Sequence, residues 1–285
     1  MRVIQRVGVM NRGGQETLWM NFLRKSRNIE LQMDFLVGTS LKGDYDDEIS
    51  DLGAKVIYQG DCRKKGILKW FDNMHTVAKT LKSIGKCDVF HINNYLVFDT
   101  LSDVIAAKLA GINKIIVHSH NSEGPHRIVQ IILRPILNKM GIIRVACSDK
   151  AAEWMFGTKD NIPIINNGIE TEKYKLDPNI REQFRESLKI LNDEILIGHV
   201  GRFDEQKNHT FLLDIFFEIS KRNDKVKLIL VGCGPLETLI REKVKKLELE
   251  DKVIFYGTSN KVNEIMMAMD LFLFPSLYEG LPLVL

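Results

Sequence analysis

Short apolar runs alternate with helix-like hydrophobic patterns along almost the whole chain. The apolar runs, bounded by glycine and polar turns, predict strands at residues 3–9, 33–37, 55–58, 89–93, 114–118, 144–147, 163–166, 195–200, 227–231, 253–256 and 271–274. Between them, apolar residues recur with a helical period, most clearly at 17–25, 70–84, 99–110, 210–222 and 235–247. This alternation predicts an α/β protein whose parallel sheets are covered by helices on both faces.

The predicted strands fall into two sets, and a chain of 285 residues suits two domains of ordinary size. The segment N-N-G-I that begins at Asn166, followed by a polar stretch to Asn192, has the composition of a linker. We therefore predict an N-terminal domain at 1–167 and a second domain at 168–285, each with a doubly wound, Rossmann-like sheet. Two such domains facing each other would form a ligand cleft between their strand ends.

Composition and charge bear on location. No apolar run reaches the roughly 18 residues of a membrane span, and the N-terminus lacks the features of a signal peptide, so we expect a cytoplasmic protein. The first 167 residues carry 23 Lys and Arg against 17 Asp and Glu, whereas residues 168–285 carry 17 against 20. This basic first half suggests peripheral contact with the inner face of the plasma membrane.

The stretch 124–148 sharpens this expectation because it contains no acidic residue. Four basic residues lie there among Ile, Leu and Val: Arg127, Arg134, Lys139 and Arg144. Basic side chains on an apolar stretch suit an anionic lipid surface, and the alternative is a core helix with solvated basic ends. Pro135 argues against one long uninterrupted helix here.

Several polar segments follow predicted strands directly, where open α/β sheets bind their ligands. The clearest is G-R-F-D-E-Q-K-N, in which Gly201 allows a tight exit from the strand. Arg202 and Lys207 then supply the cationic donors that a diphosphate needs. The alternative is a solvated loop in which Arg202 pairs with Asp204 and Lys207 with Glu205.

Two other turns carry paired glycines. Gly232 and Gly234 belong to V-G-C-G-P, and Gly13 and Gly14 belong to N-R-G-G-Q-E after the first strand. Such glycines let the backbone approach a ligand and bring helix N-terminal amides close to it, although an ordinary strand–helix turn would also explain the first pair. The patterns G-x-G-x-x-G and G-x-x-x-x-G-K are absent from these turns, which argues against a nicotinamide dehydrogenase and a P-loop NTPase.

Histidines mark the ends of two further strands. His118, His120 and Asn121 follow one of them, and His91 follows another. Imidazoles at these places can hydrogen-bond sugar hydroxyls or a reacting centre, and alternation along a strand predicts that only one of His118 and His120 faces a ligand. The remaining histidines have no partner pattern and are expected to be structural or exposed: His75, His126, His199 and His209.

The segment F-P-S-L-Y-E-G-L-P follows the last predicted strand. It delivers Ser276 and the carboxylate of Glu279 at a strand end, with Gly280 where a helix would begin. A carboxylate here could accept hydrogen bonds from sugar hydroxyls, and the positive end of the helix would face a phosphate. The alternative is a surface glutamate on a loop. The scattered cysteines show no metal-ligand spacing, so no metal site is expected.

Together these motifs resemble the retaining, nucleotide-sugar-dependent glycosyltransferases of family four (group 1), which have the GT-B architecture. The resemblance spans the chain, in the order M-N-R-G-G-Q-E-T, V-H-S-H-N, I-N-N-G-I-E, G-H-V-G-R-F-D-E-Q-K-N, V-G-C-G-P-L and F-P-S-L-Y-E-G-L-P-L-V-L. It is strongest to bacterial enzymes of exopolysaccharide or capsule assembly.

The resemblance implies roles for the quoted residues. The positions of Arg202 and Lys207 bind the donor diphosphate, that of Glu279 contacts the donor sugar, and that of His118 lies beside the reacting carbon. The expected donor-side contacts are Gly13, Gly14, Gly201, Gly232, Gly234, Ser276 and Gly280. The expected acceptor-side contacts are His91, His120 and Asn121.

The implied reaction moves a hexose or amino-hexose from a nucleotide sugar, commonly UDP-linked, to a lipid-linked saccharide with retention of configuration. It needs no metal, no covalent cofactor and no nucleic acid. The family pattern also places a second glutamate at position 287 and completes the second domain beyond Leu285, so the resemblance implies a C-terminally truncated chain with an incomplete second domain. A nucleotide-sugar 2-epimerase of the same fold and a non-catalytic nucleotide-sugar-binding fragment are the alternative functions.

Overall fold

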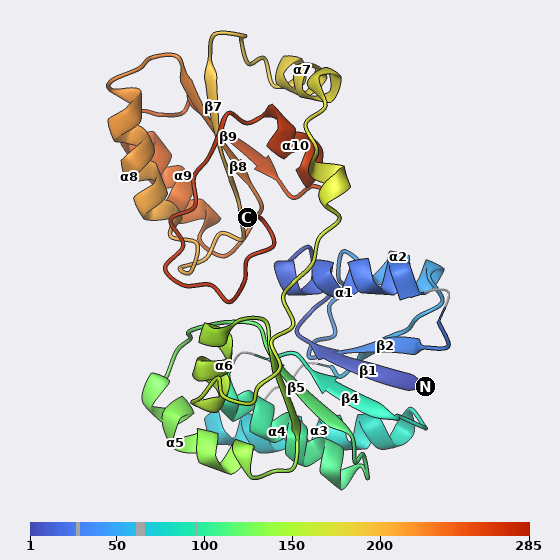
Figure 1. The fold of residues 1–285 in the computed structure, drawn as a ribbon. Coiled ribbons are helices and arrows are strands. Elements are labelled where there is room, and N and C mark those ends of the chain that lie inside the picture. The colour runs from blue at the N-terminus through green and yellow to red at the C-terminus, as the bar shows by residue number, and fades with distance from the viewer. Residues whose placement is uncertain (27–28, 61–65, 95) are drawn as a thin grey trace. The chain divides into compact units, whose positions relative to one another are not determined.

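A computed structural model describes residues 1–26, 29–60, 66–94 and 96–285. The chain divides into two compact units. The first contains Met1–Ile169, Glu279–Leu283 and Leu285, and the second contains Glu170–Tyr278 and Val284. Each unit is built on its own parallel sheet with helices packed against it, which confirms the predicted α/β class (Figure 1).

The first unit contains a six-stranded sheet in the order β3-β2-β1-β4-β5-β6. Every neighbouring pair in it is parallel, as apolar strands linked by helices require. The strand order reverses between β1 and β4, which is where ligands bind in sheets of this topology. The strands are β1 Arg2–Val7, β2 Gln32–Val37, β3 Val56–Tyr58, β4 Val89–Ile92, β5 Ile115–Ser119 and β6 Ile143–Ala146.

Helices cover both faces of this sheet (Figure 1). On one face α1 and α2 bury Trp19, Met20 and Ile49 against Phe35. On the other face α3, α4 and α6 pack over a core that includes Phe90. The helices are α1 Gly14–Lys25, α2 Asp46–Asp51, α3 Gly66–Ser83, α4 Val97–Leu109, α5 Arg127–Asn138 and α6 Asp149–Phe156.

The second unit contains a four-stranded parallel sheet in the order β10-β7-β8-β9. Helices α8 and α9 cover one face, where Leu212 and Phe216 of α8 are buried. Helices α7 and α10 cover the other face, where Ile265 of α10 is buried. The strands are β7 Ile195–Val200, β8 Val226–Val231, β9 Val253–Gly257 and β10 Leu271–Phe272. The helices are η2 Thr171–Tyr174, α7 Pro178–Ser187, α8 His209–Ser220, α9 Glu237–Lys246 and α10 Val262–Ala268.

The outcomes of three sequence predictions bear on the site. The strand expected at 163–166 contributes one isolated bridge, between Ile164 and Ala146, because the chain leaves the sheet there. Helix α5 ends at Asn138, three residues beyond Pro135, and β6 follows, so the stretch 124–148 is not one uninterrupted helix, as expected. Residues Glu279–Leu283, expected in the second domain, belong to the first unit, where Leu281 packs against the core.

Candidate functional site

The loop between β7 and α8 carries the two cations predicted to bind a diphosphate. Arg202 is exposed, and its side chain forms no hydrogen bond or ion pair within the described part of the chain, so the alternative pairing with Asp204 is absent; only the backbone O of Arg202 accepts from Asp204 N, at 2.9 Å. Lys207 is half-buried, and its Nζ lies 5.1 Å from the centroid of the Phe274 ring. The backbone N–H of Lys207 donates to Asp204 Oδ1 at 3.2 Å, which closes the turn. Asp204 therefore shapes the loop and leaves the guanidinium of Arg202 available.

Two amides flanking Lys207 fasten this loop to the segment after β10. Gln206 Nε2 donates to Tyr278 O at 2.9 Å, and Leu277 N donates to Gln206 O at 2.9 Å. Asn208 Nδ2 donates to Pro275 O at 3.3 Å. Sequence analysis assigned no role to Gln206 or Asn208; the only signal was their position on either side of the lysine.

Ser276 lies within the segment that these amides hold. Its Oγ is buried and has no hydrogen-bond partner among the residues described. A buried hydroxyl without a partner calls for an explanation, and a ligand group is one of the ordinary ones. Ser276 therefore stays a candidate for donor contact.

The glycines at 232 and 234 are explained by loop packing. A Cβ on Gly232, whose φ is +133°, would lie 2.1 Å from Gly201 O, and one on Gly234 would lie 2.4 Å from Phe203 O. The same loops are joined by hydrogen bonds from Phe203 N to Cys233 O and from Leu236 N to Phe203 O, both at 3.0 Å. The close approach that requires glycine here is therefore to the neighbouring loop, and donor contact by either glycine stays a prediction.

Three histidines of the first unit form one cluster. The rings of His91 and His118 stack with centroids 5.4 Å apart, and His120 lies 4.0 Å from His118. Trp19 of α1 meets all three rings edge-on, at 4.9 to 6.3 Å. Side chains two residues apart on a strand point to the same face, so alternation does not separate His118 from His120, and the argument that only one of them faces a ligand was wrong.

These histidines are neutral hydrogen-bonding groups. Burial, followed by the charge of His118, lowers the pKa of His91 to about 3. Burial lowers the pKa of His118 to about 4 and that of His120 well below its usual value. His120 Nε2 and Asn93 Oδ1 are 3.1 Å apart; because an amide oxygen only accepts, Nε2 carries the proton.

Several nitrogens of the cluster remain available to a ligand. Both ring nitrogens of His118, Nε2 of His91 and Nδ1 of His120 are buried without a partner in the described ranges. Neutral imidazoles with open nitrogens suit contacts to hydroxyl groups, which both donate and accept. Asn121 is used locally, since its Oδ1 accepts from Ser122 N at 3.0 Å.

The paired glycines before α1 differ from each other. A Cβ on Gly13 would lie 2.3 Å from Glu16 Oε2, whereas one on Gly14 would meet no atom within 4 Å. Gln15 Nε2 donates to Asn93 O at 3.1 Å, which ties the start of α1 to the end of β4. The carboxylate of Glu16 is the end of a flexible side chain and can move aside, and Gly14 faces open space, so packing requires glycine at neither position and donor contact by both stays a prediction.

The segment Glu279–Leu283 crosses to the first unit and packs beside the histidine cluster. A Cβ on Gly280 would lie 2.1 Å from His120 O and 3.0 Å from Cys147 Sγ. Ser148 Oγ donates to Gly280 O at 2.8 Å, and Asn167 Nδ2 donates to Leu281 O at 2.7 Å. Gly280 therefore permits a close backbone contact, and the helix predicted to begin there is not formed among the residues described.

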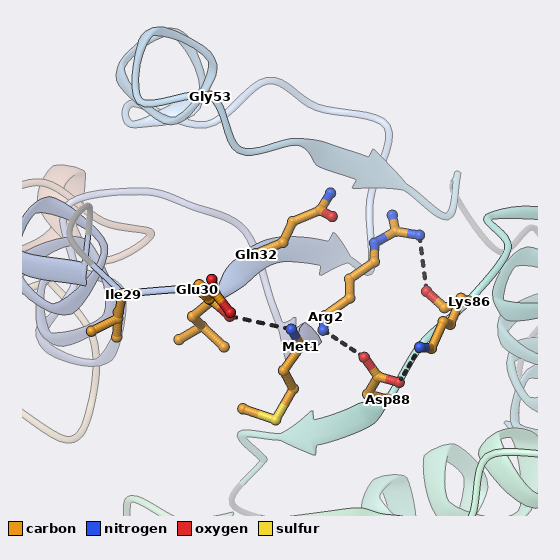
Figure 2. A pocket seen from close by; sticks show the side chains of 9 residues that line it. Met1, Arg2, Ile29, Glu30, Gln32, Gly53, Lys86 and Asp88 are labelled. Atoms are coloured by element: carbon orange, nitrogen blue, oxygen red, sulfur yellow. Dashed lines mark hydrogen bonds and ion pairs between the residues drawn. The ribbon is translucent and has the colours of Figure 1, made fainter.

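A pocket of about 750 Å³ lies at the opposite end of the first sheet, where its strands begin. Its polar groups are turned toward one another (Figure 2). The N-terminal amine donates to Glu30 O at 3.2 Å, and Arg2 N donates to Asp88 Oδ2 at 2.8 Å. The residues described as lining the pocket include none of the candidate site residues.

Comparison with known proteins decides the family. Residues 180–285 match the model of the family described as Glycosyl transferases group 1. The chain is 32% identical over 294 residues to the putative glycosyltransferase EpsF of Bacillus subtilis, in an alignment that covers all of this chain and 75% of that protein. The chain belongs to the group 1 glycosyltransferases. This assignment favours the transferase over the 2-epimerase alternative.

Further relatives agree with the assignment. This group 1 glycosyltransferase is 26% identical over 238 residues to the UDP-Gal:alpha-D-GlcNAc-diphosphoundecaprenol alpha-1,3-galactosyltransferase of Escherichia coli, covering 79% of this chain and 60% of that protein. Anabaena Alr3699/HepE, solved in complex with UDP and glucose, superimposes with a TM-score of 0.78 at 19% identity, over 97% of this chain and 74% of that one. This likeness confirms the GT-B fold, with its two Rossmann-like sheets.

Replacing Gly280 by alanine is expected to destabilise the first unit of this group 1 glycosyltransferase. In Gly280→Ala the new Cβ displaces the segment from His120 O, so the bonds from Ser148 and Asn167 are lost. At roughly 1 kcal/mol for each bond, we expect the first unit to lose about 2 kcal/mol of unfolding free energy. Denaturant unfolding measures this. Gly168→Ala is the matched control, because a Cβ there meets nothing within 4 Å; equal stability of the two variants would contradict the prediction.

Proposed function

We propose that this glycosyltransferase moves a hexose or amino-hexose from a UDP-linked donor to a lipid-linked saccharide, with retention of configuration, during polysaccharide assembly. The name of the Escherichia coli relative supports both the UDP-linked donor and the lipid-linked acceptor. UDP and glucose bound to the HepE structure support the donor further.

The observation that carries the proposal is the exposed guanidinium of Arg202, on a loop fastened by Gln206 and Asn208. The reaction breaks the bond between the anomeric carbon and the donor phosphate oxygen. It forms a bond from the acceptor hydroxyl oxygen to that carbon on the same face, and the hydroxyl proton passes to the departing phosphate oxygen. Arg202 and Lys207 stabilise the negative charge that grows on the diphosphate.

The first unit supplies neutral groups for the sugars. In the proposal His118 lies beside the reacting carbon, while His91, His120 and Asn121 contact the acceptor. The low pKa values of His91 and His118 keep both imidazoles uncharged, so they add no positive charge near the oxocarbenium-like transition state. Glu279 accepts hydrogen bonds from donor hydroxyls in this scheme.

The test incubates the 285-residue chain with single radiolabelled donors (UDP-glucose, UDP-galactose, their N-acetylamino forms and GDP-mannose) and bacterial lipid extract. We expect one UDP-sugar to be consumed and its label to enter the lipid fraction, equally with and without EDTA. Loss of transfer in EDTA would contradict the metal-free mechanism. A new sugar epimer formed without acceptor, or no transfer from any UDP-sugar, would contradict the proposed function.

We further propose that the protein works at an anionic membrane surface through α5. Among the residues described, no helix is long and apolar enough to cross a membrane. The isoleucines of α5 form one helical stripe that is strongly exposed, with Ile128 at 74% and Ile132 at 65%. The stretch 124–148 has no acidic residue, so apolar and basic groups lie together, as an interfacial helix requires. The outward-facing stripe supports the membrane proposal over the core-helix alternative, while Leu137 on the other side of α5 packs in the core.

The prediction is that Ile128→Ser/Ile132→Ser weakens binding to phosphatidylglycerol-containing vesicles at least tenfold in co-sedimentation. Two isoleucine side chains inserted into the lipid interface contribute several kcal/mol of transfer free energy. Their replacement is therefore expected to account for most of the loss in vesicle binding. The control is Leu239→Ser, which likewise replaces an exposed aliphatic side chain by serine, at a 50% exposed leucine of α9. Binding that equals wild type, or a dimer broken by the same variant in light scattering, would contradict lipid as the occupant.

A further inference from the structure

Two histidines to which the sequence assigned no role are buried at the two ends of the loop 201–208. His199, on β7, is 0% exposed, and His209, the first residue of α8, is 2% exposed. Their ring centroids are 4.8 Å apart, with the rings nearly perpendicular. The pair therefore bridges the start and the end of the loop that carries Arg202 and Lys207.

His199 has one satisfied nitrogen and one open nitrogen. Its Nδ1 lies 2.8 Å from Leu273 O, and because a carbonyl only accepts, Nδ1 carries the proton. Nε2 then holds a lone pair and is buried without a partner in the described part of the chain. Leucine would fill this space without the cost of an unpaired polar atom, so the histidine needs an explanation beyond packing.

Two routes lead from this imidazole to Lys207. On one side Gly201 lies between them, since a Cβ there would be 2.9 Å from His199 Nε2 and 3.2 Å from both Cγ and Cδ of Lys207. On the other side the bond to Leu273 O fixes the residue before Phe274, whose ring lies 5.1 Å from Lys207 Nζ. The ring of His199 also stacks on that of Phe274 at 6.1 Å.

We propose that His199 is a positioning residue that holds Lys207 in place for the donor diphosphate, with His209 fixing the orientation of its ring. The inference rests on the proposed function, in which Lys207 contacts the diphosphate. Its essential element is the hydrogen bond from Nδ1 to Leu273 O, which holds the Phe274 ring beneath the lysine. The contact of Gly201 with both side chains keeps the lysine stem over the imidazole.

Titration calorimetry of the 285-residue chain with UDP and with uridine tests this, because only UDP carries the diphosphate. The measured quantity is the ratio of the two dissociation constants. We expect Lys207→Ala and His199→Leu each to lower the preference for UDP about tenfold. We expect His199→Asn, whose Nδ2 can replace Nδ1 as donor to Leu273 O, to stay within about threefold of wild type.

The outcomes distinguish failure of the diphosphate role of Lys207 from failure of the positioning role of His199 alone. If wild type does not prefer UDP, or if Lys207→Ala leaves the preference unchanged, the diphosphate role fails and this inference fails with it. If Lys207→Ala lowers the preference but His199→Leu does not, only the positioning role is overturned. Equal weakening of UDP and uridine by His199→Leu, or failure of His199→Asn to restore the preference, indicates a structural role and also overturns it.

Discussion

Arg202→Ala is expected to lower kcat/KM for the UDP-sugar about a hundredfold, with most of the loss in kcat. The guanidinium is exposed and forms no ion pair within the described ranges, so its removal breaks no ion pair there. A charge-assisted hydrogen bond to phosphate contributes roughly 1.5–3 kcal/mol, which corresponds to about 10- to 150-fold. The effect belongs mainly to kcat because the diphosphate gains charge as the sugar–phosphate bond breaks. Steady-state turnover of the donor identified in the screen measures it.

Two further variants provide an intermediate case and a control for this result. Arg202→Lys keeps the charge but loses the planar fork, so an intermediate loss is expected. Arg222→Ala removes an exposed arginine just after α8 and should leave kcat/KM unchanged. Activity of Arg202→Ala within about tenfold of wild type would show that Arg202 does not serve the diphosphate.

Acidification from pH 7.5 to pH 5 is expected to destabilise the second unit by about 4 kcal/mol, and the first unit, which also contains the buried His120, by at least as much. Burial, followed by the charge of His118, lowers the pKa of His91 to about 3, and burial lowers that of His118 to about 4. In the second unit burial is the main cause that lowers the pKa of His199 to about 4 and of His209 to about 3. The unfolded chain, with a histidine pKa near 6.5, binds more protons than the folded chain between about pH 4 and 6.5. Stability therefore rises with pH in this window and falls by about 2 kcal/mol for each such histidine at pH 5.

Urea unfolding at several pH values measures this dependence. His118→Gln removes one titrating group from the first unit, so its stability should fall less steeply with acid, by about one proton in the slope. His75→Gln, at an exposed histidine of α3, should keep the wild-type slope. Equal stability at pH 5 and pH 7.5 would show that these imidazoles are not held neutral by the fold.

Local patterns account for the parts of the fold and site that could be predicted. Most strands in the structure end within a few residues of the end of the apolar run that predicted them. The reason is that a buried parallel strand needs continuous apolar side chains. The loop at Gly201 and the histidines at the C-terminal ends of β4 and β5 were predicted near strand ends for the same reason. The stretch 124–148 is not one long helix, as Pro135 suggested, since α5 ends at Asn138 and β6 follows; the proline itself lies inside α5 because a proline weakens a helix without having to end it.

Contacts between distant segments account for what was missed. Gly232 requires glycine because Gly201 O approaches it, and Gly280 because His120 O approaches it. The hydrophobic periodicity of the sequence does not indicate which loops come into contact. The same holds for His199, whose partner Leu273 is 74 residues away along the chain.

By itself, the sequence determined the α/β class, the alternation of strands and helices, and the polar loops at the strand ends, since all of these follow from local hydrophobic period and turn chemistry. Only the tertiary structure decided that three histidines form one neutral cluster, that Glu279–Leu283 belongs to the first unit, and that the buried His199 and the stem of Lys207 both lie close to Gly201. The physical reason is that burial, protonation state and close backbone approach are properties of pairs of segments. Those pairs exist only once the parallel sheets have brought their strand ends together.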